Sequence, residues 1–276
     1  MSTWFITGCS TGLGRALATA VLESGANAVV TARDAEAVAD LADAHPDAAL
    51  ALALDVTDPA QVRAAVARAE ERFGAIDVLV NNAGYGYRAA VEEGDDADIR
   101  RLFDTNFFGA VDMIKAVLPA MRARRSGSIV NISSIGARIF PAGSGYYSAS
   151  KAALEGMSGS LRKELEPLGI AVTVVEPGGF RTDFSGRSLT QSAEAIADYA
   201  ETAGTRRKEN DATHGTQAGD PAKAARAILD TVESGRAPFL LLLGEDALAG
   251  FRVALDALRD DSEAWEATTR STGFES

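Results

Sequence analysis

Residues 3–14, Thr-Trp-Phe-Ile-Thr-Gly-Cys-Ser-Thr-Gly-Leu-Gly, are the stretch that decides the fold of this chain. The apolar residues 4–7 predict a short strand, and a turn with three glycines follows it directly. A run with leucine and valine at helical spacing then begins at Leu13. A strand, a glycine turn and a helix in this order suit a dinucleotide, because glycines let the backbone approach a pyrophosphate and a helix N-terminus offers free N–H groups.

The glycine turn has two other interpretations. Its spacing is G-x-x-x-G-x-G rather than G-x-G-x-x-G, so a tight corner without a ligand is one alternative. Residues 8–12 also match G-x-S-x-G, the nucleophile elbow of α/β-hydrolases, with Ser10 as nucleophile and His214 as a distant base. Position argues against the hydrolase, because several strands precede the elbow in that fold, whereas this turn follows the first predicted strand.

Apolar runs alternate with helical patterns along the rest of the chain, which predicts a doubly wound (Rossmann) α/β fold with helices on both faces of a parallel sheet. We expect about seven strands, at residues 4–7, 28–32, 50–54, 76–80, 127–132, 170–175 and 239–243. A helix is expected near 193–204, within a polar insertion at about 183–220. A C-terminal helix and tail start at about 245, and the whole chain, 1–276, is expected to be one domain.

Composition narrows the function classes. The 39 acidic side chains exceed the 27 lysines and arginines and give a net charge of −12, which argues against nucleic acid and anionic membranes as partners. Cys9 is the only cysteine and there are two histidines, so we expect no internal disulfide, no metal site and a reducing, cytoplasmic location. The longest apolar runs, 48–54 and 239–243, are far shorter than a bilayer span.

Arg33 follows the second predicted strand, where such folds place the residue that meets the adenosine ribose. An acid at this place accepts from the ribose 2′-hydroxyl, whereas a guanidinium suits a 2′-phosphate. Arg33 therefore favours NADP over NAD, although the neighbouring Asp34 leaves NAD possible. The alternative is that Arg33 is only a solvated residue at the start of the next helix.

Tyr147 and Lys151 stand four residues apart in Y-S-A-S-K, at the start of a helical pattern. This spacing places both side chains on one helix face. A nearby ammonium favours the phenolate and lowers the pKa of a tyrosine, so the pair could act as a general acid or base. An isolated pair of this kind is more often an exposed surface pair, so the other motifs decide.

Seven motifs follow one another in residues 3–183. They are T-G-C-S-T-G-L-G from Thr7, D-V from Asp55, N-N-A-G from Asn81, Asn106, S-S from Ser133, Y-S-A-S-K from Tyr147 and P-G-G-F-R-T from Pro177. In this combination the chain resembles the short-chain dehydrogenase/reductase family of the classical type. The phrases I-T-G-C-S, V-N-N-A-G-Y-G and V-E-P-G-G-F-R-T are most similar to its 17β-hydroxysteroid-dehydrogenase-like branch.

The resemblance implies an NAD(P)-dependent oxidoreductase that interconverts a ketone and a secondary alcohol. Tyr147 would exchange the proton, Lys151 would lower the pKa of Tyr147 and hold the nicotinamide ribose, and Ser134 would hydrogen-bond the oxyanion. Ser133 is the runner-up for Ser134, and Asn106 would hold a water in a proton relay from Lys151. The implied cofactor residues are Gly8, Ser10, Thr11, Gly12, Leu13, Gly14, Arg33, Asp55, Val56, Asn82, Ala83, Gly84, Tyr147, Lys151, Pro177, Gly178 and Thr182.

Three aromatic residues, Phe140, Tyr146 and Phe180, flank the expected reaction site and suggest an apolar carbonyl or alcohol substrate, although each could equally serve core packing. The insertion would cover the substrate. The helix after Tyr147 has small residues on its early face, and members of the family commonly form dimers or tetramers. We therefore expect a homodimer or homotetramer. Trp265 and Phe274 of the tail would pack on a neighbouring subunit. A protein that binds NADP without turnover, as a sensor or partner subunit, is the alternative to the enzyme.

Overall fold

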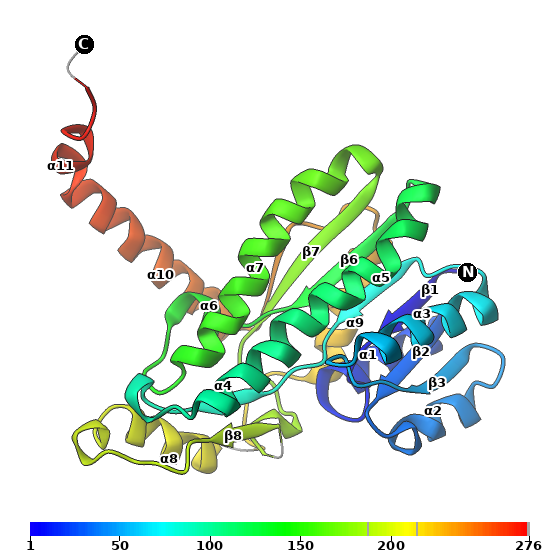
Figure 1. Cartoon of the computed structure of the whole chain (residues 1–276), viewed down its shortest axis with the longest axis horizontal. Coiled ribbons are helices and arrows are strands. Elements are labelled where there is room, and N and C mark those ends of the chain that lie inside the picture. Colours follow the sequence, from blue (N-terminus) through cyan, green and yellow to red (C-terminus); the bar gives the residue numbers. More distant parts are fainter. Residues whose placement is uncertain (187, 214, 275–276) are drawn as a thin grey trace.

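The central element is a sheet of seven parallel strands in the order β3-β2-β1-β4-β6-β7-β9 (Figure 1). The computed structural model describes residues 1–186, 188–213 and 215–274. The strands are β1 (Thr3–Ile6), β2 (Asn27–Ala32), β3 (Ala49–Ala53), β4 (Val78–Asn81), β6 (Gly127–Ile132), β7 (Ile170–Pro177) and β9 (Leu240–Leu243). The predicted doubly wound sheet is confirmed, and each predicted strand occurs within two residues of its expected bounds.

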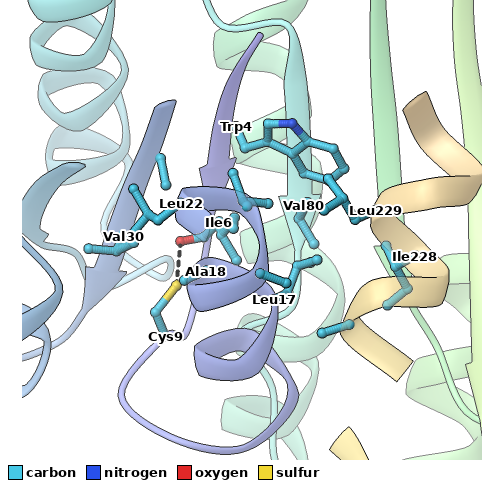
Figure 2. Close-up of a cluster of buried hydrophobic side chains, with 14 of the residues drawn as sticks. Trp4, Ile6, Cys9, Leu17, Ala18, Leu22, Val30, Val80, Ile228 and Leu229 are labelled. Carbon is cyan, nitrogen blue, oxygen red and sulfur yellow. Dashed lines mark hydrogen bonds between the residues drawn. The ribbon is translucent and has the colours of Figure 1, made fainter. Parts of the chain in front are cut away.

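Helices cover both faces of the sheet. On one side lie α1 (Gly12–Glu23), α2 (Ala39–Ala44) and α9 (Pro221–Glu233), and on the other lie α3 (Pro59–Phe73), α5 (Gly109–Arg124) and α7 (Gly145–Leu165). Side chains alternate along a strand, so Trp4 and Ile6 enter the first layer and Phe5 the second. Figure 2 shows the first layer, where Trp4 and Ile6 pack with Leu17 of α1 and Leu229 of α9.

The glycine turn places its cysteine in this core. Cys9 is fully buried, and its thiol donates a hydrogen bond to the Ile6 carbonyl at 3.2 Å (Figure 2). Burial raises the pKa of this thiol to about 12, against weaker opposing effects of the Thr31 backbone and Arg15. Cys9 is therefore a packing residue that stays protonated, not a nucleophile.

The helical segment that contains Asn106 is interrupted. It consists of α4 (Asp96–Phe103), a π-helical turn η3 (Asp104–Phe108) and then α5. A π-turn inserts one extra residue into the helical path and often occurs at functional sites. Asn106 and Gly109 stand at this point, and both residue types are unfavourable in a helix interior.

The insertion differs from its prediction. Its helix α8 spans Ala203–Thr213, and the residues near 193–204 form only the short turn η6 (Ala197–Tyr199) instead of the expected helix. The physical reason is a tertiary contact, because Glu93 Oε1 accepts from Ile196 N at 2.8 Å and the Glu93 carbonyl accepts from Ser192 Oγ. A two-stranded sheet of β5 (Gly86–Arg88) and β8 (Leu189–Gln191) was not predicted.

The C-terminal helix α10 (Glu245–Ala264) is longer than predicted and projects away from the sheet, followed by α11 (Glu266–Arg270) (Figure 1). Val253 and Leu258 on α10 and Trp265 behind it are each at least 65% exposed, so this helix has an apolar surface without cover from the described part of its own chain. The remaining short elements are η1 (Ala35–Val38), η2 (Val91–Glu93), α6 (Gly136–Ile139), η4 (Glu166–Leu168) and η5 (Asp183–Ser185).

Candidate active site

The glycine turn after β1 is fixed by side chains from the end of β4. Asn82 Nδ2 donates to the carbonyls of Thr7 and Gly8 at 2.8 and 2.9 Å, and the Thr7 hydroxyl accepts from the backbone N–H groups of Asn82 and Ala83 at 2.9 Å. This network joins the two central strands at their carboxyl ends, where open α/β sheets bind ligands.

Two glycines are required by how closely these segments approach. Gly8 has φ +73°, and a Cβ there would lie 2.9 Å from the Ala83 Cα. A Cβ on Gly14 would lie 2.5 Å from the Gly8 carbonyl oxygen and closer still to Asn82 Nδ2. The spacing of the turn thus follows from packing against the N-N-A-G segment, with which it forms one unit.

A cavity of about 760 Å³ opens over this unit, between the carboxyl ends of the strands and the insertion. It is lined by every residue predicted to bind the cofactor except Gly14, which lies buried beneath the turn. Residues from six segments that are far apart in sequence therefore meet in one space. The cavity reaches from Arg33, which follows β2, to Tyr147 on α7, and this extent suits an elongated ligand.

Tyr147, Ser134 and Lys151 come together at one end of this cavity. The Ser134 and Tyr147 side chains both flank Gly136, where a Cβ would lie 3.3 Å from Ser134 Oγ and 3.6 Å from Tyr147 Cε1. Ser134 Oγ accepts from Gly136 N at 3.0 Å. Lys151 Nζ donates to the Ile132 carbonyl at 2.8 Å and lies 6.0 Å from the centre of the Tyr147 ring. Both Tyr147 and Lys151 are buried, at 7% and 5% exposure, so the surface-pair interpretation does not hold.

Burial is the largest influence on the pKa values of Tyr147 and Lys151. It raises the pKa of Tyr147, while the hydrogen bond from Ser134 and the charge of Arg88 act in the opposite direction. Burial lowers the pKa of Lys151 to about 8, opposed by the charge of Glu155. The effect of Lys151 on the pKa of Tyr147 stays a prediction, and the cation whose charge acts on the phenol in this structure is Arg88.

Ser133 has a different partner from Ser134. Its hydroxyl donates to Glu155 Oε1 at 2.5 Å, next to the buried Glu176 and the partly exposed Arg138. Burial raises the pKa of Glu155 to about 7, reinforced by the charge of Glu176. Ser133 is thus held by a carboxylate, which leaves Ser134 as the serine on Tyr147.

Asn106 lies in the π-turn, 2% exposed and outside the cavity wall. Its Oδ1 accepts from Tyr85 N at 3.0 Å, and its Nδ2 donates to the Tyr85 carbonyl and to Ser150 Oγ at 2.9 and 3.1 Å. The side chain therefore connects the loop after β4 to α7. Its expected role in a proton relay stays a prediction.

Of the three aromatic residues predicted at the reaction site, one lines the cavity and two do not. Phe180 lines the cavity, but Phe140 and Tyr146 are not among the described residues that do so. Phe140 is 65% exposed, and Tyr146 packs on Tyr87 with ring centres 6.3 Å apart. The aromatic residue that stands against Tyr147 is Phe184, at 5.7 Å between ring centres. Phe184 follows Thr182 in the insertion, so its closeness to that motif was the signal that could have identified it.

Arg33 lines the cavity at the end of β2, as predicted. Asp34 does not, because its carboxylate accepts from Glu36 N at 3.1 Å and caps η1. Ser10 also lines the cavity, but it donates no hydrogen bond to a histidine within the described chain, and His214 lies outside the described residues.

Two further properties concern the described chain as a whole. Across residues 1–186, 188–213 and 215–274, no cluster of three or more His, Cys, Asp or Glu side chains is arranged to hold a metal ion. Within the same ranges, no helix has both the length and the apolar character needed to cross a bilayer.

Comparison with known proteins identifies the family. Residues 2–193 match the family model of the short chain dehydrogenases. The oxidoreductase BOA17 of Botryotinia fuckeliana is 39% identical over 263 residues, which cover 95% of this chain and 96% of that protein. A short-chain dehydrogenase structure from Streptomyces avermitilis is 43% identical with a TM-score of 0.92, covering 99% of this chain and 100% of the other.

A short-chain dehydrogenase/reductase structure from Burkholderia phymatum, in complex with NAD, has a TM-score of 0.82 at 23% identity and covers 96% of this chain and 95% of its own. At this identity it supports the fold alone. The region that the family model matches includes both the glycine turn and the Y-S-A-S-K segment. This chain therefore belongs to the short-chain dehydrogenase/reductase family of oxidoreductase enzymes.

Proposed function

We propose that this enzyme interconverts a ketone and a secondary alcohol with NADP as the preferred cofactor. The observation that carries the proposal is that Tyr147, Ser134 and Lys151 meet in the wall of one cavity, which the glycine turn also lines. A proton donor and an oxyanion partner are thereby aimed at the same point.

The cavity fits a dinucleotide. Gly8 and Gly12 line the cavity with backbone and no side chain, and Arg33 adds a guanidinium to the same wall. The glycine turn and the start of α1 would hold the pyrophosphate, and Lys151 would hold the nicotinamide ribose. When bound, the nicotinamide supplies or takes the hydride.

In reduction, Tyr147 donates its proton to the carbonyl oxygen, and Ser134 donates a hydrogen bond to the same oxygen as negative charge develops. Burial favours the neutral phenol, so the proton donor is fully populated at neutral pH. In oxidation the same groups act in reverse, with the phenolate as base. The cavity wall at this end includes Phe180 and Phe184, which fits a substrate with an apolar part.

The NADP preference is supported by the contrast between neighbours. Arg33 lines the cavity. The carboxylate of Asp34 instead caps η1, where it accepts a hydrogen bond from Glu36 N. The side available to a ribose 2′-substituent is therefore positive, which suits a phosphate.

The test is a panel of ketones and secondary alcohols, followed by NADPH absorbance, with wild type and Tyr147→Phe. We expect turnover that falls by about 10²–10⁴-fold in the variant, while NADPH binding, measured by fluorescence, is retained. Unchanged turnover in Tyr147→Phe would refute the mechanism. A cellular role that survives in the inactive variant would favour the sensor or partner subunit instead.

We also infer a homo-oligomer in the cytoplasm. The exposed apolar residues of α10 and the tail support the first statement, and the single buried Cys9 fits a reducing compartment. Light scattering after size-exclusion chromatography tests the assembly, and a monomer at micromolar concentration would contradict it.

A further inference from the structure

Arg88 is a buried cation beside the catalytic tyrosine that the mechanism above does not use. It lies on β5, is 6% exposed, and its carbonyl accepts from Ser192 N at 2.9 Å, so the insertion covers it. The guanidinium carbon is 5.9 Å from the centre of the Tyr147 ring. Arg88 is thus as close to the phenol as Lys151 is.

The guanidinium has no anionic partner among the described residues. Its Nε and Nη1 atoms are buried without a hydrogen-bond partner, and no ion pair of the described chain includes it. The nearby charge is another cation, Arg206 of α8. Burial lowers the pKa of Arg88 to about 10, followed by the effect of Arg206, so the group is still charged at neutral pH.

Two other arginines that are at least partly covered have carboxylate partners. Arg207 donates to Glu93 Oε2 at 2.6 Å, and Arg138 bonds both Glu155 and Glu176. Leaving a buried charge unpaired is strongly unfavourable, and contact with an aromatic ring offsets only part of the cost. A site that keeps such a charge next to its reacting group is suited to an anionic ligand.

We propose that Arg88 binds a carboxylate of the substrate, so that the enzyme acts on oxo acids and hydroxy acids. This inference rests on the proposed ketone and alcohol chemistry and narrows it. A planar guanidinium binds a carboxylate with two parallel hydrogen bonds. Because Arg88 adjoins the ring whose hydroxyl meets the carbonyl, the carboxylate lies only a few bonds from the reacting carbon.

The insertion covers Arg88 and closes this site through β8 and Phe184. β8 pairs with β5, placing Gln191 opposite Arg88, and Phe184 packs on Tyr147. The substrate reaches Arg88 when this segment moves, and its return removes water from the ion pair, which strengthens the attraction.

The experiment compares each oxo acid with its own methyl ester. The pairs are 4-oxopentanoate and 3-oxobutanoate with their methyl esters, and the variants are Arg88→Met and Arg88→Lys. We expect wild type to have the higher kcat/KM for each acid, and the acid-to-ester ratio to fall about 30-fold or more in Arg88→Met and less in Arg88→Lys. The ratio cancels any effect of Arg88 on the pKa of Tyr147, because that effect is common to both substrates.

An unchanged ratio in Arg88→Met, or a wild type that prefers the esters, overturns the proposal. If circular dichroism shows that Arg88→Met does not fold, the wild-type ratio and Arg88→Lys decide. If wild type turns over neither member of a pair, the panel of ketones and alcohols described above decides on the proposed chemistry, and calorimetry of 4-oxopentanoate on the NADP complex tests Arg88 alone. Binding that Arg88→Met loses supports the site, and any other result rejects it. Inhibition by inorganic phosphate but not by acetate also rejects a carboxylate site.

Discussion

Replacing Gly14 with alanine tests whether the glycine turn is set by packing. The new Cβ would lie 2.5 Å from the Gly8 carbonyl oxygen and nearer to Asn82 Nδ2, so one of these groups must move. Moving Asn82 breaks its hydrogen bonds to Thr7 and Gly8, which are worth about 1 kcal/mol each. Overpacking adds about 1–3 kcal/mol, so Gly14→Ala should destabilise the protein by about 3–5 kcal/mol.

The assay is equilibrium urea unfolding, together with NADPH affinity measured by fluorescence. Affinity should fall as well, although Gly14 does not line the cavity, because Gly8 and Asn82 do. The matched control is Gly156→Ala in α7, where a Cβ meets nothing within 4 Å. That change should stabilise the protein by about 0.5–1 kcal/mol, since glycine is unfavourable inside a helix. A loss below about 1 kcal/mol for Gly14→Ala, with normal affinity, would refute the packing argument.

Two further predictions concern charges in the cavity. Arg33→Ala should weaken NADPH binding about 10-fold or more and NADH binding little, as measured by fluorescence titration; equal losses would contradict an NADP preference. The second uses Lys151, whose pKa is about 8 in the folded protein, against an ordinary value of 10.5. The unfolded chain binds more protons between these values, so this group adds stability as pH rises from about 8 to 10.5, by up to about 3 kcal/mol. The unfolding free energy of wild type minus that of Lys151→Met should therefore increase between pH 7.5 and pH 10, and a constant difference would count against the buried lysine.

Local sequence was sufficient for the sheet and for most of the cavity. The strands could be predicted because each is a short, largely apolar run between turn signals. The cavity residues could be predicted because they follow the carboxyl ends of those strands, and parallel strands bring these ends to one edge. The π-turn at Asn106 was also foreseeable, since asparagine and glycine are poor residues for a helix interior.

What the sequence could not predict depends on contacts between distant segments. The insertion adopts an extended path at 192–196 because Glu93 accepts hydrogen bonds there, and no periodicity in the insertion signals that partner. Phe140 was expected at the reaction site, but it is exposed and Phe184 stands against Tyr147 instead. Arg88 carries no local signal at all, because its importance lies in burial and in the absence of a described counter-charge.

The order of strands in the sheet has a consequence for how the protein reaches its native state. β1 lies between β2 and β4, and its Trp4 pairs with Val78, so the centre of the sheet closes only after a long intervening segment has found its place. Parallel pairings of this kind are slow to form because loop entropy is lost before contacts compensate it. The ligand cavity needs that closure and the insertion as well. We therefore expect late folding intermediates with a complete N-terminal half and no affinity for nucleotide, and ligand added during refolding should speed only the final kinetic phase.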